Sequence, residues 1–216
     1  MNLTSSTRGT QALRLALELA TSESGRISRK TLSDHFAGMG KFLVGLGLLK
    51  PEGHSTSIAT QDDLAAAVEW SPERDSYGYF SETDGWIDLA ADTISTFALQ
   101  VHPLVRLLTA QIDLQPPDLF NEIKENLLWE VGSGRLPGRA KRVQFWVGRR
   151  LHNASVWQSF VHATRDRPTQ ELRVVLHLAE REIPDAPFVA NHAIVAVGSI
   201  ISAENTFQID AAVMNR

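Results

Sequence analysis

Apolar residues in the first fifty positions recur at a spacing that predicts helices. Residues 10–21 open with a threonine suited to cap a helix and continue through strong helix formers. A second helix is expected to start at Ser28, whose hydroxyl can accept free backbone amides, and to be interrupted by Gly38 and Gly40. The apolar run 41–49 predicts a third helix, which the proline and glycine beyond it would end.

Residues 10–60 resemble a winged helix-turn-helix module. The segment from Leu32-Ser33 to Gly38 is similar to the first helix and turn of that module. The run Leu46-Gly47-Leu48-Leu49 is similar to the usual approach to its wing. The resemblance implies a helical N-terminal module of a class that binds DNA through its second helix.

The expected second helix of this module departs from a DNA-reading pattern. The segment between the two turns is too short for a full recognition helix, and it offers only Lys41 to a groove. A helix that reads bases needs several exposed polar or basic side chains over its first turns. We therefore expect packing or protein contact from this helix, while phosphate contacts remain open to the nearby basic residues Arg26, Arg29 and Lys30.

Residues 61–91 alternate short aromatic runs with turns, which is typical of an antiparallel meander. The strand-like runs are 68–70, 77–80 and 86–89, and Asp84-Gly85 is a dipeptide favoured in hairpin turns. Because the chain has no cysteine, a zinc ribbon would lack thiolate ligands here. Aromatic side chains are therefore expected to hold this region together.

Two further helices are expected between the meander and the C-terminal part of the chain. Apolar residues recur at helical spacing over 92–112, although Pro103 must bend or split that helix. Asp118 can cap a helix over 118–131 whose apolar residues fall on one face. The glycines that follow would terminate it.

The remaining pattern is that of an α/β subdomain. Residues 143–147 and 172–178 are strand-like, and the intervening 154–164 suits an amphipathic helix. A strand, helix, strand order predicts a parallel pair joined by a right-handed crossover. Residues 193–201 predict a third strand, and 207–210 a short edge strand.

The predicted fold class is therefore α+β. We expect a helical winged-helix-like module over 1–60, a short antiparallel β-meander over 61–91, a helical link over 92–131 and a small α/β subdomain over 132–216.

The charge of the chain changes sign twice. The formal charge is +4 over residues 1–50, −12 over 51–130 and +4 over 131–216. The acidic middle would repel a polyanion, whereas the two flanks could attract one. The alternative is that the three segments neutralise one another inside one folded body.

The stretch 130–151 concentrates the candidate binding residues. It joins a glycine-rich segment to a strand with basic residues at both ends. Arginine forks match phosphate oxygens, so a nucleic-acid backbone or another polyanion is the expected ligand. Since the glycines follow a predicted helix, we expect a helix terminator and not a phosphate cradle. The candidate polyanion-binding residues are Arg135, Arg139, Lys141, Arg142, Arg149 and Arg150, assisted by Arg26, Arg29 and Lys30.

Other polar clusters carry no recognisable chemistry. The acidic patch of Glu82, Asp84, Asp88 and Asp92 lacks the spacing of a calcium loop and is expected to be a solvated face or a docking surface for arginines. The histidines lack metal-ligand spacing, and His177 alternates with apolar residues as a buried strand residue would. No catalytic residue, metal site or cofactor is therefore predicted.

These observations favour a non-enzymatic nucleic-acid-associated or regulatory protein that binds a phosphate backbone. Two alternatives remain open: a subunit of a protein assembly, formed with a partner or with further copies, and an α/β enzyme acting on a phosphorylated or nucleotide substrate. No membrane span is expected, because the longest apolar stretch is far below the roughly 20 residues required. The absence of cysteine and the polar N-terminus lead us to expect a cytoplasmic protein.

Overall fold

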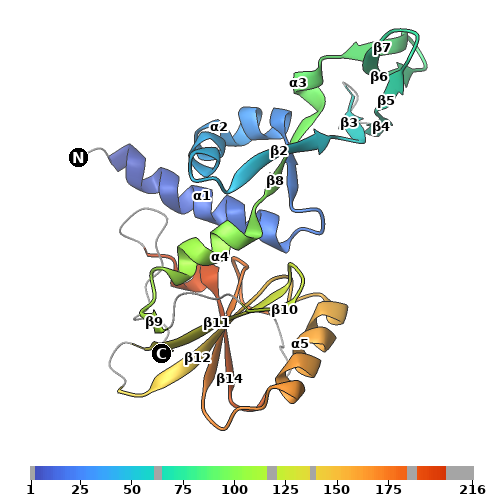
Figure 1. Cartoon of the computed structure of the whole chain (residues 1–216). Coiled ribbons are helices and arrows are strands. Elements are labelled where there is room, and N and C mark those ends of the chain that lie inside the picture. The colour runs from blue at the N-terminus through green and yellow to red at the C-terminus, as the bar shows by residue number, and fades with distance from the viewer. Residues whose placement is uncertain (1–2, 61–64, 116–120, 137–139, 184–188, 203–216) are drawn as a thin grey trace. The chain divides into compact units, whose positions relative to one another are not determined.

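The structure, a computed structural model, is a mixed α+β protein (Figure 1). It describes residues 3–60, 65–115, 121–136, 140–183 and 189–202. The chain divides into two compact units, residues 24–99 and residues 1–23 with 100–216. Among the described residues, no helix is long and apolar enough to cross a membrane.

A three-stranded antiparallel sheet and a kinked helix form the centre of the unit 24–99. The strands pair in the order β1-β8-β2, and α2 contacts all three of them. Pro51 lies in β2 at the edge of this sheet, where its missing N–H removes no ladder hydrogen bond. The bounds are β1 (Arg26–Ser28), α2 (Arg29–Gly45), β2 (Leu49–His54) and β8 (Ser95–Leu99).

Helix α2 begins where the sequence predicts and ends later. The Ser28 hydroxyl accepts the backbone N–H of Thr31, as an N-cap should. The expected interruption falls at Phe36, two residues before Gly38, where non-helical backbone angles kink the helix; Gly38 and Gly40 themselves lie in the helical segment after the kink. The helix expected over 41–49 is the end of this second segment, which stops at Gly45.

The end of α2 is a Schellman motif. Gly47, at φ 71°, donates to the carbonyl of Val44, and the next amide, that of Leu48, donates to the carbonyl of Leu43. The chain then enters β2 directly. The glycine that the sequence places near a helix end thus terminates α2 at this position.

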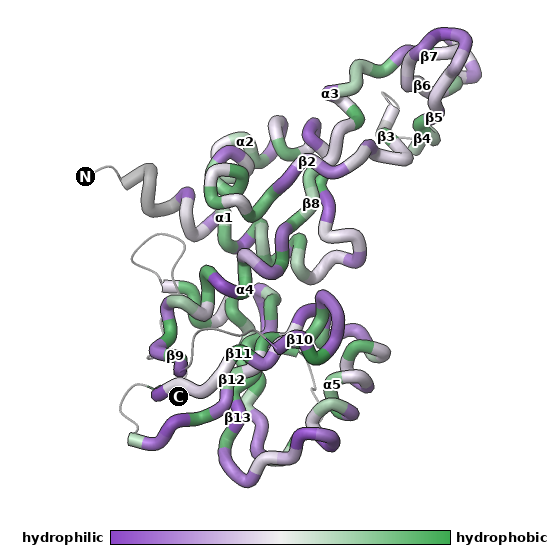
Figure 2. Tube along the Cα trace, in the orientation of Figure 1, coloured by the Kyte–Doolittle hydropathy of each residue, from purple (hydrophilic) through white to green (hydrophobic). Residues whose placement is uncertain are grey.

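The predicted antiparallel meander is confirmed. Strands β5, β6 and β7 form one three-stranded sheet, while β3 and β4 form a separate hairpin. Figure 2 shows hydrophilic turns beside β7, consistent with the many carboxylates of this segment. The bounds are β3 (Ser57–Ala59), β4 (Ala65–Ala67), β5 (Glu69–Ser71), β6 (Ser76–Ser81), β7 (Gly85–Leu89) and α3 (Ala91–Ile94).

The other unit is built on a six-stranded mixed sheet. Its main path is β10-β11-β12-β13-β14, and β9 also pairs with β11. The bounds are α1 (Leu3–Thr21), α4 (Val101–Thr109), β9 (Leu114–Gln115), β10 (Asn121–Lys124), β11 (Leu128–Arg135), β12 (Arg142–Gly148), α5 (Ala154–Asp166), β13 (Arg173–His177), β14 (His192–Ala196) and the 3-10 turn η1 (Val197–Ile200).

The expected strand, helix, strand order is confirmed in this sheet. Strands β12, β13 and β14 are parallel, and α5 connects the first two. Every residue of β13 is buried, as expected for a parallel strand covered on both faces. Helix α5 packs through Trp157 and Phe160 against Trp146 and Val175 of the sheet. The expected edge strand at 207–210 lies outside the described residues.

One further predicted helix is correct only in part, and another is wrong. The helix expected over 92–112 is helical in α3 and α4, but residues 95–99 between them form the central strand β8. The described part of the helix expected over 118–131 is a hairpin of β10 and β11, turned at Asn126 with φ 54°. In both places apolar spacing resembles a helix, but pairing with neighbouring strands satisfies the backbone instead.

Candidate functional site

The described glycines of the stretch 130–151 lie in strands, Gly132 and Gly134 in β11 and Gly148 in β12, whereas Gly138 lies outside the described residues. The expected helix terminator is wrong, because Gly132 and Gly134 lie inside β11. Gly132, at φ 117°, sits at an irregularity in the pairing of β11 with β12. A Cβ on Gly134 would approach the backbone oxygen of Asp113 to 2.9 Å, so glycine permits the close packing of the β9 segment here.

This pairing brings basic residues together at one end of the β11–β12 hairpin. Arg135 and Arg142 are direct cross-strand partners, and Lys141 immediately precedes β12. We call Arg135, Lys141 and Arg142 the basic hairpin end. Arg139, a further candidate, lies outside the described residues. The sequence places these cations within eight positions, and the strand register aligns two of them.

The basic hairpin end is only weakly neutralised. Arg142 donates to the carbonyl of Ser133 at 3.0 Å, and its other terminal nitrogen lies 3.7 Å from a carboxylate oxygen of Asp113. Asp113 is 73% exposed, so this ion pair contributes little. Among the described residues, Arg135 and Lys141 form no ion pair. Like charges directly across a strand pair repel, and a bound anion would relieve that repulsion.

Arg149, beyond the other end of β12, has a structural role. Its Nε donates to the carbonyl of Ala20 at 2.7 Å, and Nη2 donates to the carbonyl of Ser22 at 3.3 Å. The guanidinium therefore satisfies carbonyls at the C-terminus of α1, where a cation also interacts favourably with the helix dipole. The side chain is buried, which lowers the pKa of Arg149, as does the neighbouring charge of Arg150.

Arg150 also lies close to a residue of its own chain. It adopts a left-handed backbone conformation, φ 58°, and a terminal nitrogen lies 3.9 Å from a carboxylate oxygen of Glu23. Its Nε is buried without a hydrogen-bond partner. Arg149 and Arg150 therefore separate from the basic hairpin end, both in position along β12 and in the partners that they use.

The three N-terminal candidates differ from one another. Arg26 pairs with Glu52, and Arg29 pairs with Asp92, so both are matched by the acidic middle of the sequence. Lys30 forms no ion pair among the residues that the structure describes. Internal pairing, the alternative raised by the charge pattern, thus applies to two of these three residues.

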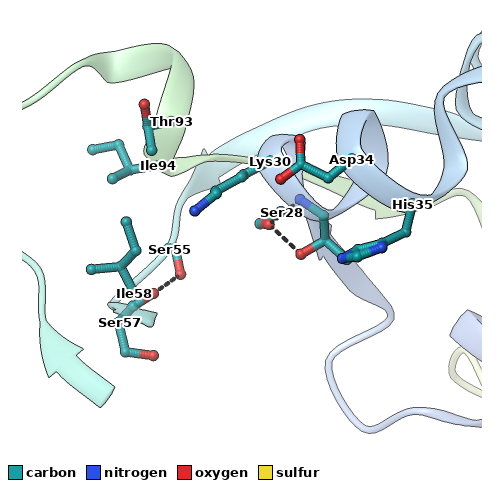
Figure 3. Close-up of a pocket in the computed structure, with 10 residues that line it drawn as sticks. Ser28, Lys30, Asp34, His35, Ser55, Ser57, Ile58, Thr93 and Ile94 are labelled. Carbon is teal, nitrogen blue, oxygen red and sulfur yellow. Dashed lines mark hydrogen bonds between the residues drawn. The ribbon is translucent and has the colours of Figure 1, made fainter. Parts of the chain in front are cut away.

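Lys30 borders a hollow beside the start of α2. The hollow measures about 430 Å³, and Figure 3 shows the Lys30 side chain extending toward Ser55. Serine and threonine hydroxyls line much of it, while Asp34 supplies a carboxylate and His35 an imidazole. This mixed lining can hold a small polar group, but it has no excess of positive charge.

His177 is buried in β13, as the alternating pattern predicts. Neither ring nitrogen has a hydrogen-bond partner, and the ring centroid lies 6.1 Å from that of His152. Burial, together with the smaller effect of the neighbouring His152 charge, lowers the pKa of His177 to about 4. No cluster of three or more potential metal ligands occurs within the described ranges. The pair therefore offers no metal centre.

One exposed feature was not recognised from the sequence. Trp70 and Phe80 of the meander are 47% and 73% exposed, and both lie near carboxylates. The pattern of aromatics in strands suggested packing, because alternation alone does not tell which face is covered. Comparisons with protein-family models, curated proteins and solved structures find no match for this chain.

Proposed function

We propose that the protein binds the phosphate backbone of nucleic acid at the basic hairpin end, as a non-enzymatic regulatory or nucleic-acid-associated protein. The observation that carries the proposal is the cross-strand register of Arg135 and Arg142 next to Lys141, where Arg142 faces the exposed carboxylate of Asp113. Three cations that lie close together at the ends of two paired strands can contact neighbouring phosphates. Arginine forks suit that geometry.

The unit 24–99 supports the proposal in a secondary way. A helix kinked at Phe36 and a three-stranded β1-β8-β2 sheet are consistent with a winged-helix-like module whose wing region contains the meander. The segment after the kink presents Lys41 as its sole basic residue. Base reading by this helix is therefore disfavoured, and Lys30 is the residue there best able to contact a phosphate.

The experiment measures fluorescence anisotropy of a labelled DNA duplex and a labelled RNA duplex against salt concentration. Each phosphate contact contributes a slope of about 0.9 in log affinity against log salt. The triple variant R135Q/K141Q/R142Q should reduce the magnitude of the slope of log affinity against log salt by about 2 to 3. The matched control R14Q/R74Q/R165Q removes equal charge from exposed arginines elsewhere and should retain most of the slope.

A substitution at Asp113 tests the same proposal by an expected gain in duplex affinity. Since its carboxylate faces Arg142, it competes with a phosphate for that guanidinium. Asp113→Asn should tighten duplex binding by about threefold, the range expected from one exposed ion pair. Absence of duplex binding by the wild-type chain at low salt would end the proposal.

A further inference from the structure

The meander presents exposed aromatic side chains within a strongly acidic segment. Phe80 and Trp70 are the most exposed large hydrophobic residues among those described. Residues 69–89 contain six carboxylates and a single basic residue, Arg74. Exposed aromatic groups are typical of surfaces that contact a partner. The negative charge of residues 69–89 would repel a nucleic acid. The expected contact is therefore with a basic group.

A hollow of about 580 Å³ lies between β4 and the β5–β6–β7 sheet. Three alanines of β4 form one side of it. Tyr79 and Ile87, directly opposite each other in the β6–β7 register, contribute aromatic and aliphatic surface, and Phe80 also lines the hollow. The hollow is therefore lined by both apolar and polar groups, and the β4 alanines and Phe80 supply part of its apolar surface.

The charged residues that line this hollow are acidic. They are Glu69, Glu82 and Asp84, and none of the described lining residues is basic. Asp84 accepts a hydrogen bond from the Thr83 hydroxyl at 2.9 Å, whereas Glu69 and Glu82 form no ion pair among the described residues. The one basic residue nearby, Arg74, pairs with Asp88, which does not line the hollow.

We propose that this hollow is a docking site for an arginine side chain in a basic segment of a partner protein. The aliphatic stem of the arginine would lie against the β4 alanines, while the planar guanidinium would stack on Phe80, which the pairing of β5 with β6 places on the same face of the sheet as Glu69. Glu69 and Glu82 would accept its hydrogen bonds. This site lies in the unit 24–99, whereas the basic hairpin end belongs to the other unit, so the two functions can be tested separately.

The test uses the full chain and a fluorescein-labelled octapeptide of alternating glycine and arginine. Citrulline replaces arginine in a second peptide, which keeps the shape and removes the charge. Anisotropy should show at least about tenfold weaker binding of the citrulline peptide. The variants E69Q/E82Q and Phe80→Ala should each weaken arginine-peptide binding roughly fivefold.

A matched control is E18Q/E171Q, which removes two exposed carboxylates outside the hollow and should leave binding within about twofold. The hairpin variant R135Q/K141Q/R142Q should also bind the peptide normally. Equal binding of the two peptides would overturn the proposal. So would unchanged affinity in both hollow variants, or an equal loss in E18Q/E171Q, which would indicate general charge attraction.

Discussion

Arg149 should be one of the most important single side chains for the stability of its unit. It satisfies two carbonyls at the end of α1 from a position 127 to 129 residues later in the chain. The perturbation is Arg149→Met, which preserves most of the apolar stem and removes every donor. Ala20 and Ser22 would then lose their guanidinium partner.

The magnitude follows from the geometry. The 2.7 Å bond to Ala20 is a well-formed charge-assisted hydrogen bond, worth about 2 kcal/mol. The 3.3 Å bond to Ser22 and the attraction to the helix C-terminus add about 1 kcal/mol together. We therefore expect Arg149→Met to lower the free energy of unfolding by about 3 kcal/mol.

The assay is urea denaturation followed by tryptophan fluorescence and far-ultraviolet circular dichroism. Arg14→Met is the control, because Arg14 is 56% exposed and its ion pair with Glu180 is solvated. That variant should change stability by less than about 1 kcal/mol. If Arg149→Met lies within about 0.5 kcal/mol of wild type, the capping role assigned to Arg149 is wrong.

Three further predictions concern other parts of the fold. Gly134→Ala should lose about 2 kcal/mol in urea denaturation, because the new methyl group meets backbone at 2.9 Å; an unchanged midpoint would contradict the packing of β11 on the β9 segment. Ser28→Ala should lose about 1 kcal/mol by removing the N-cap of α2, whereas Ser28→Asp should restore it. His177 has its pKa lowered from 6.5 to about 4, so stability should be complete above pH 6.5 and fall by about 3 kcal/mol as pH drops toward 4. His177→Leu should remove most of this pH dependence of the free energy of unfolding, measured by denaturation at a series of pH values. If the variant depends on pH as steeply as wild type, the role assigned to His177 is wrong.

Strongly patterned elements could be predicted from the sequence. Strand β12 and helix α5 were predicted within a few residues, because a continuous apolar run and a clear amphipathic period left no competing structure. The meander was predicted from its turns, including Asp84-Gly85, where Gly85 adopts φ 74°. The residues within each of these elements are therefore sufficient to indicate its secondary structure.

Other elements depend on partners that lie far away in the sequence. Residues 95–99 have helical apolar spacing, yet they form β8 because β1 and β2 offer backbone pairing on both sides. Asn126 allows a tight turn that the apolar spacing of 118–131 conceals. Secondary-structure propensity alone does not predict strand pairing between segments that are far apart in the sequence.

The candidate site was predicted only in part. The sequence brings Arg135, Lys141 and Arg142 close together, and the register of β11 with β12 aligns Arg135 with Arg142. The sequence could not indicate that Arg149 caps α1, since that contact joins residues 129 positions apart. Nor could it distinguish the paired Arg26 and Arg29 from Lys30, which forms no ion pair within the described part of the chain, because the partners come from later elements.

The most direct test of the central claim is the salt dependence of duplex binding by the wild-type chain and by R135Q/K141Q/R142Q. If the basic hairpin end contacts phosphates, wild-type affinity falls steeply as salt concentration rises. In R135Q/K141Q/R142Q the slope of log affinity against log salt concentration becomes smaller in magnitude by about 2 to 3, whereas R14Q/R74Q/R165Q keeps most of the wild-type slope. Identical slopes for wild type and R135Q/K141Q/R142Q would contradict the claim.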